Sequence, residues 1–198
     1  MIEILGRQMR LIFQQPDTAP PPPTVIPDSP VIEFSAWAED CRLYGSLELD
    51  GDRLSDMLNL YDELVLVDVL AQGFDGGPIT EIPELSITRD EILVVEASGP
   101  RGNPTRRRHL RPFPISVQLG DFNVRGNVHV SPGADPMVAL SRRPPMVALT
   151  DAQLTYRDSP QVLSDAANAT VLFNWHLVTS IDLGNRELPR LTEMTGAA

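Results

Sequence analysis

The sequence of 198 residues contains no lysine, so all sixteen basic residues are arginines. Its single cysteine, Cys41, excludes an internal disulfide and a metal site built from cysteines. No apolar run approaches the roughly 20 residues that span a bilayer. The first residues also lack the basic start and the continuous apolar stretch of a signal peptide. We therefore expect a cytoplasmic protein without a membrane span, in which Cys41 fills space in a strand.

The motifs of common catalytic sites are missing as well. There is no nucleophile-elbow glycine pattern, no phosphate-binding loop and no dinucleotide-binding fingerprint. His109, His129 and His176 do not show the spacing of metal ligands, which usually converge in threes or fours. We therefore predict that the chain is not an enzyme and has no catalytic residues, no cofactor and no metal.

The net charge of −11 is concentrated in one part of the chain. Residues 32–98 carry sixteen acidic residues and three arginines, whereas residues 99–113 carry five arginines and no acid. The acidic part would repel a nucleic acid backbone, so only the basic segment could attract one. The alternative, which the charges favour, is contact with the acidic part of the same or a neighbouring chain. The residues concerned are Arg106, Arg107, Arg108 and Arg111.

An apolar peptide on a stiff spacer forms the start of the chain. Residues 1–15 have apolar spacings that suit either an amphipathic helix or an added strand. Residues 16–30 hold seven of the nineteen prolines, which favours a semi-rigid, extended spacer. Docking on another chain and folding back over the same chain both fit this arrangement, and we favour the first. The residues predicted to dock are Ile4, Leu5, Met9, Leu11, Ile12 and Phe13.

Short apolar segments rich in β-formers follow the spacer. Examples are Val31–Trp37 and Ile92–Val95, separated by Gly, Pro, Asn and Asp clusters. The run from Leu64 to Leu70 is almost continuously apolar and predicts a buried strand. Residues 31–98 therefore read as an all-β unit of about five strands.

Residues 114–185 repeat this order, which predicts a tandem β protein with a linker at 99–113 and a tail at 186–198. Chance similarity of two β segments is the alternative. Leu64–Asp68 matches Val147–Asp151 at an offset of 83, and Ile92–Val95 corresponds roughly to Val171–Asn174. At an offset of 81, Asp40, Gly45, Leu47 and Leu49 match Asp121, Gly126, Val128 and Val130.

The first copy contains a short polar and apolar segment, residues 53–59, that predicts a helical turn. Asp52 is expected to cap it, with Leu54, Met57 and Leu58 facing inward and Asn59 ending the turn. The second copy has residues 134–140 at this place, so we expect it to lack the turn. The residues predicted to set this conformation are Arg53, Asp56 and Asn59.

The segment Arg53–Asn59, after the strand Gly45–Leu49, resembles a family of uncharacterised bacterial domains for which no function is implied. The order of Gly45, Leu47, Asp56, Asn59, Leu64, Leu66 and Asp68 is similar to the first motif of Sm-like small barrels. Arg89–Ile92 lies where the second Sm motif would be. This resemblance implies two bent, five-stranded barrels whose edges pair with neighbours, and single-stranded RNA binding.

These observations lead to one main hypothesis on function and two alternatives. We expect a non-enzymatic structural or adaptor protein that assembles with itself or with a larger complex. The barrel edges and the N-terminal peptide would mediate this assembly. The first alternative is an Sm-like protein that binds single-stranded RNA through the basic linker. The second is a small-ligand binder with its site between the two domains.

Overall fold

The computed structural model describes residues 29–100, 109–157 and 169–184. The chain divides into two compact units, Met1–Thr105 and Arg106–Ala198, with the boundary inside the segment predicted to be a linker. Most of the described elements are antiparallel β-strands, so the all-β prediction is confirmed.

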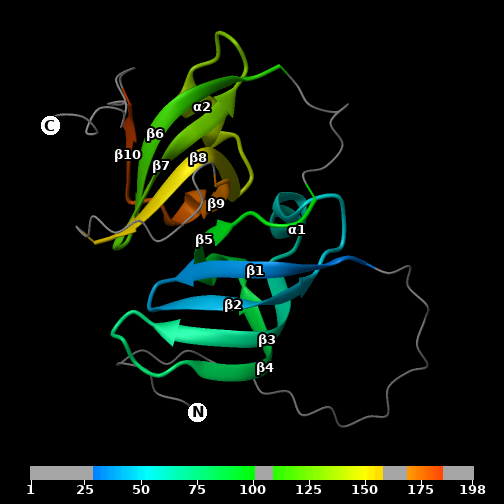
Figure 1. Ribbon diagram of the computed structural model, residues 1–198. Helices are drawn as coiled ribbons and strands as arrows, with labels where there is room; N and C mark the ends of the chain where they lie inside the picture. The colour runs from blue at the N-terminus through cyan, green and yellow to red at the C-terminus, as the bar shows by residue number, and fades with distance from the viewer. Residues whose placement is uncertain (1–28, 101–108, 158–168, 185–198) are drawn as a thin grey trace, which may run out of the picture. The chain divides into compact units, whose positions relative to one another are not determined.

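In its described residues, 29–100, the first unit is an antiparallel sheet with one α-helix and one 3₁₀ helix (Figure 1). Its strand order is β5-β1-β2-β3-β4, in which each strand pairs with a neighbour in antiparallel register. The 3₁₀ helix lies between the last two strands. The elements are β1 (Val31–Ala38), β2 (Cys41–Glu48), α1 (Leu54–Leu60), β3 (Glu63–Gly73), β4 (Thr80–Thr88), η1 (Arg89–Glu91) and β5 (Ile92–Glu96).

Alternating side chains of this sheet form the core of the first unit, because successive residues of a strand point to opposite faces. In β3, Leu64, Leu66 and Val69 are buried, whereas Val65, Val67 and Leu70 are exposed. The prediction of a fully buried strand from Leu64 to Leu70 is therefore wrong. The sequence is misleading here because apolar residues occupy both faces of a strand that is covered on only one.

The pairing of β2 with β3 contains a bulge at a point where the two strands come close together. The register shifts between Tyr44 and Ser46, and Asp68 has a φ of 52°. A Cβ atom on Gly45 would lie 3.0 Å from the carbonyl oxygen of Val67. Glycine is therefore suited to this position because it lets the two backbones approach.

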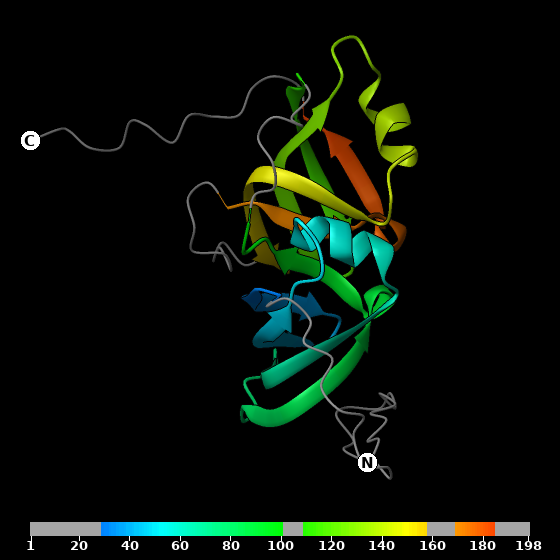
Figure 2. The same ribbon diagram turned by 90° about the vertical axis from the view of Figure 1, so that its right-hand side faces the viewer.

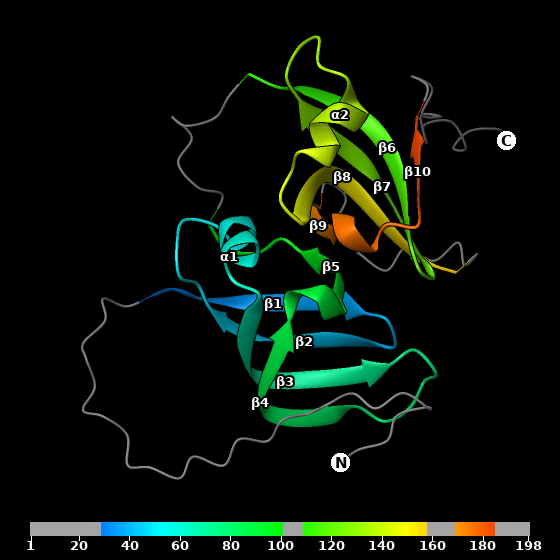
Figure 3. The same cartoon turned by 180° about the vertical axis from the view of Figure 1, so that it is seen from behind.

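The second unit has its own antiparallel sheet, with the order β10-β6-β7-β8-β9 (Figure 3). Its first strand begins at Arg111, so residues 111–113 belong to a strand and not to the predicted linker. Their backbone pairs with the end of the next strand, Val128–Val130. The elements are β6 (Arg111–Leu119), β7 (Phe122–Val130), α2 (Pro136–Ser141), β8 (Met146–Tyr156), β9 (Val171–Asn174), η3 (Trp175–Leu177) and β10 (Ser180–Leu183).

The second unit repeats the strand order of the first, including the bulge. The register between β7 and β8 shifts between Arg125 and Asn127, around Gly126, and Asp151 has a φ of 51°. A Cβ on Gly126 would lie 3.0 Å from the carbonyl oxygen of Thr150. The offsets of 81 and 83 found in the sequence therefore connect positions of the same geometry.

One predicted correspondence between the units is wrong. Val171–Asn174 is β9, which pairs with β8 and precedes η3, so its counterpart is β4 and not Ile92–Val95. The counterpart of β5 is β10, which pairs with β6 as β5 pairs with β1. Short apolar runs look alike in the sequence, and only the pairing distinguishes the fourth strand from the fifth.

The helices between the second and third strands of each unit correct two further expectations. In α1, Leu54, Met57 and Leu58 are buried as predicted, but Arg53 occupies the N-cap position and Asn59 lies inside the helix. The second unit keeps a helix at this place, so the expectation that it lacks the turn is wrong. Its different sequence still begins a helix, because Asp135 caps α2 by accepting a hydrogen bond from the Val138 amide at 3.0 Å.

Candidate binding surface on the first unit

The first unit presents one continuous sheet face that points away from its core, which we call the outer face. Strand pairing places Trp37 beside Arg42, Ser35 beside Tyr44, and Tyr44 beside Leu70. Paired residues of antiparallel strands point to the same face. The residues of the outer face used below are Ser35, Arg42, Tyr44, Val65, Val67, Leu70, Glu81, Glu84 and Glu96, together with Trp37, which lies on the same side of the sheet but is fully buried.

Three aliphatic side chains of β3 lie exposed on the outer face, and we call them the apolar row. Val65, Val67 and Leu70 are 52%, 39% and 40% exposed. Glu84 pairs with Val67 and Glu81 pairs with Leu70, so exposed carboxylates of β4 border the row. Single exposed apolar residues are common on proteins, whereas a contiguous group with a polar border is typical of an interaction surface.

The second unit shows that this fold does not require the apolar row. The strand pairing aligns Val65, Val67 and Leu70 with Ala148, Thr150 and Gln153 of β8. Each aliphatic side chain is thus replaced by a smaller or more polar one in the same register. The row is therefore a property of the first unit, and the second unit provides matched positions for control variants.

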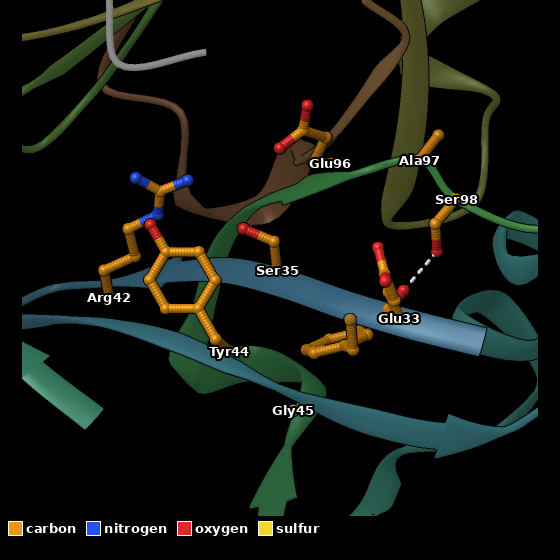
Figure 4. A pocket seen from close by; sticks show the side chains of 9 residues that line it. Glu33, Ser35, Arg42, Tyr44, Gly45, Glu96, Ala97 and Ser98 are labelled. Atoms are coloured by element: carbon orange, nitrogen blue, oxygen red, sulfur yellow. Dashed lines mark hydrogen bonds between the residues drawn. The ribbon is translucent and has the colours of Figure 1, made fainter. Parts of the chain in front are cut away.

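A hollow of about 400 Å³ lies on the part of the outer face formed by β1, β2 and β5 (Figure 4). Figure 4 shows the side chains of Ser35, Arg42, Tyr44 and Glu96 pointing to the same side of the strands. The hydroxyl group of Ser98 donates a hydrogen bond to the carbonyl oxygen of Glu33 at its rim. The hollow therefore offers a guanidinium group, carboxylates and hydroxyl groups on one surface.

Two aromatic rings hold Arg42 in this hollow. Its guanidinium carbon lies 4.7 Å from the centre of the Trp37 ring and 4.1 Å from that of the Tyr44 ring. Such cation–π contacts contribute about 0.5–2 kcal/mol, more where water is excluded. Buried atoms of the same group, Arg42 Nε and Trp37 Nε1, have no hydrogen-bond partner among the described residues. The rings thus fix the position of the guanidinium group, while its Nε–H group is enclosed by the protein.

The residues of the predicted turn lie together and make local contacts. Arg53 Nε lies 3.9 Å from a carboxylate oxygen of Asp56, and the Asn59 side-chain amide donates to the Ser55 carbonyl at 2.8 Å. Both contacts stay within the segment that leads into and forms α1. These contacts give the residues a role in the helix.

Most of the predicted contact residues lie outside the described part of the chain. This applies to the docking residues Ile4, Leu5, Met9, Leu11, Ile12 and Phe13 and to Arg106, Arg107 and Arg108. Arg111 is described and is the exposed first residue of β6. Their roles stay predictions.

Arg89, which the sequence comparison with Sm-like barrels set against the arginine of their second motif, is largely buried in an ion pair. Its side chain is 13% exposed, and its Nη2 atom lies 2.6 Å from a carboxylate oxygen of Asp62. This geometry supports a structural role at the end of β4. Single-stranded RNA binding and a ligand site between the units stay predictions.

The histidines of the described residues make ordinary contacts. His129 Nε2 lies 2.8 Å from the Thr150 hydroxyl, and the His176 amide donates to the Asn174 side chain at 3.1 Å. Within residues 29–100, 109–157 and 169–184 there is no group of three or more His, Cys, Asp or Glu side chains that could hold a metal ion. The helices of these same ranges are too short or too polar to cross a membrane.

Sequence reasoning missed both components of the outer face. It assigned Val65, Val67 and Leu70 to a buried strand, and it placed Trp37 in a β segment without its contact to Arg42. The signal that could have revealed the row is the offset of 83, which sets these residues against Ala148, Thr150 and Gln153. The Trp37–Arg42 contact depends on strand register, which no local pattern specifies.

No family model, curated protein or solved structure matches this chain.

Proposed function

We propose that the chain is a non-enzymatic assembly protein that associates with itself through the outer face of its first unit. The apolar row carries this proposal. Val65, Val67 and Leu70 lie exposed as a group, and the second unit has smaller or more polar residues at the same positions. The neighbouring hollow supports it, since Ser35, Arg42, Tyr44 and Glu96 line it with polar groups. Together they form a surface with an apolar centre and polar surroundings, as in many protein interfaces.

The apolar row is too small to hold an assembly together alone. Complete burial of a Val or Leu side chain contributes about 1.5–3 kcal/mol, and these three are already about half buried. Their remaining contribution is therefore about 2–4 kcal/mol, whereas micromolar affinity needs about 8 kcal/mol. The polar groups beside the row, above all Arg42 and the glutamates of β4, would supply the remainder.

Association by the face has more support than association by the strand edge, which the sequence suggested. At one end of the strand order of the first unit lies β4, which contains Pro83 between Ile82 and Glu84. Proline has no amide hydrogen to donate, and charged side chains also oppose edge pairing. The backbone of β4 is thus poorly suited to adding a neighbouring strand.

We also propose that each unit is a small bent barrel of the Sm-like kind. Two features support this: the five antiparallel strands follow the same order in both units, and the β3–β4 hairpin is strongly curved (Figure 2). The bulges at Gly45 and Gly126 supply the local bending that such a sheet needs.

The test of assembly is sedimentation velocity of the full chain over a wide concentration range. We compare the wild type with Val67→Thr/Leu70→Gln, which carries the residues that the second unit has at these places. The matched control is Thr150→Ser/Gln153→Asn in β8, which changes the same two positions of the second unit without adding aliphatic side chains. We expect a concentration-dependent increase in mass for the wild type and the control, and a monomer for the first variant. A wild type that stays monomeric, or an assembly that the first variant leaves unchanged, contradicts the proposal.

A further inference from the structure

We infer that the outer face binds residues 1–15 of a second copy of this chain. This inference rests on the proposed function and names the partner segment of the same surface. The occupant is an apolar peptide that carries two arginines, Arg7 and Arg10, and one acid, Glu3. The second copy provides it on the spacer of residues 16–30.

The peptide and the face match in chemistry. The apolar side chains Ile4, Leu5, Met9, Leu11, Ile12 and Phe13 are of a size that can cover the apolar row. Arg7 and Arg10 can contact the exposed carboxylates of Glu81 and Glu84, which border the row on β4. The charge of the surrounding chain has the same sign as these carboxylates, since residues 32–98 carry sixteen acids and three arginines. Apolar contact and charge therefore favour the same peptide.

The strand register and the spacer length favour binding to a second copy. Val31 pairs with Glu48, and Ser46 pairs with Val67. The start of β1 is therefore two strands away from the apolar row and displaced from Val67 by two residues in the strand direction. With strand spacings of about 4.8 Å and a rise of about 3.4 Å, this separation is roughly 12 Å. A polyproline spacer of fifteen residues extends about 45 Å. It would carry the peptide beyond the face of its own chain.

The arginine-rich segment is the other part of the chain that could reach an acidic face, and it matches less well. Residues 99–108 contain four arginines and no aliphatic or aromatic side chain other than the rings of two prolines. Such a segment can pair with carboxylates, but it cannot cover Val65, Val67 and Leu70. Residues 1–15 provide both kinds of contact.

The experiment is competition against the assembly of the full chain, measured by sedimentation velocity. A synthetic peptide of residues 1–15 is added in excess, and a scrambled peptide of the same composition is the control. In parallel, the full-chain variant Ile12→Ser/Phe13→Ser is tested for assembly. We expect the native peptide to return the chain to a monomer, the scrambled peptide to have no effect, and the variant to stay monomeric. We also expect labelled peptide to bind Val67→Thr/Leu70→Gln about tenfold or more weakly than the control Thr150→Ser/Gln153→Asn.

The outcomes separate this inference from the proposed function. If the wild type assembles and Val67→Thr/Leu70→Gln does not, but neither the peptide nor Ile12→Ser/Phe13→Ser changes the assembly, the inference is wrong and the proposed function stands. If the wild type does not assemble at all, the proposed function fails first. If the wild type is a monomer that does not bind added peptide, whereas the variant Ile12→Ser/Phe13→Ser does bind it, residues 1–15 occupy the face of their own chain and the second-copy inference is overturned.

Discussion

Replacing Gly45 with alanine should destabilise the first unit, and replacing Gly126 should destabilise the second to a similar extent. The added Cβ would lie 3.0 Å from a backbone carbonyl oxygen in each case, that of Val67 or that of Thr150. The same Cβ would also lie 3.2 Å from Cγ2 of Val69 at position 45, or 3.2 Å from Cα of Ala152 at position 126. Backbone atoms in a paired strand cannot move away without disturbing the bulge, so both substitutions overpack the same point of the fold.

The expected magnitude follows from two opposing effects. Overpacking costs about 1–3 kcal/mol, while alanine lowers the entropy of the unfolded chain and returns about 0.4–1 kcal/mol. The net loss is therefore about 1–2 kcal/mol, which corresponds to a decrease in Tm of about 5–15 °C for a unit of this size. The control is Gly77→Ala, whose nearest neighbour is the Asp75 side-chain oxygen at 3.1 Å in a connection between strands. This side chain can rotate, so a change within about 0.5 kcal/mol is expected.

Each unit contains one of the two tryptophans, so fluorescence can follow them separately in the full chain. Trp37 is fully buried in the first unit, and Trp175 lies in η3, with its ring 6.4 Å from that of Phe173 in the second. Gly45→Ala is measured in a Trp175→Phe background and Gly126→Ala in a Trp37→Phe background, each against its own background protein. Equal stability of Gly45→Ala and its background, or a loss in only one unit, would refute the equivalence of the two bulges.

Three further predictions concern a cap, an ion pair and the thiol. Asp135→Ala should destabilise the second unit by about 0.5–2 kcal/mol in thermal unfolding, because it removes the side-chain cap of α2. Arg53→Ala should destabilise the first unit less, because the Arg53 side chain makes no capping hydrogen bond to α1. Equal losses would contradict this reasoning. Arg89→Ala should destabilise the first unit by about 1 kcal/mol in urea unfolding, since its partner Asp62 is largely exposed, and an unchanged midpoint would rule out a structural role. Burial and the nearby Asp40 raise the pKa of Cys41 from about 9 to about 11, so the folded chain holds its proton longer than the unfolded chain. Stability should therefore fall as the pH rises from 9 to 11, and Ellman's reagent at pH 8 should react slowly until the protein is unfolded; fast reaction of the folded protein would contradict the burial.

The sequence predicts the strands and the repeat better than it predicts their faces. Gly45 and Asp68 recur as Gly126 and Asp151 because a bulge restricts both positions to residues that tolerate close approach or a positive φ. Local patterns therefore carry that information. Strand identity is different, since Val171–Asn174 could be taken for the counterpart of β5 when only the pairing with β8 makes it the fourth strand.

The candidate site was harder to predict for the same reason. The contact of Arg42 with the Trp37 ring depends on the register of β1 and β2, and the exposure of Val67 depends on what covers β3. Neither is encoded in a short stretch of sequence. The N-terminal peptide was recognisable by its composition, but composition does not specify the surface that it meets.

The most direct measurement is photo-crosslinking of the full chain with p-benzoylphenylalanine in place of Val67. Equal amounts of ¹⁴N- and ¹⁵N-labelled protein are mixed before irradiation, and the crosslinked peptides are identified by mass spectrometry. The same substitution at Thr150, the matched position of the second unit, is the control. We predict crosslinks from position 67 to residues 1–15, with mixed isotopes that identify two different copies. A complete lack of mixed-isotope crosslinks, equal crosslinking from position 150, or no crosslink to residues 1–15 would contradict binding of this segment in a second copy by the outer face.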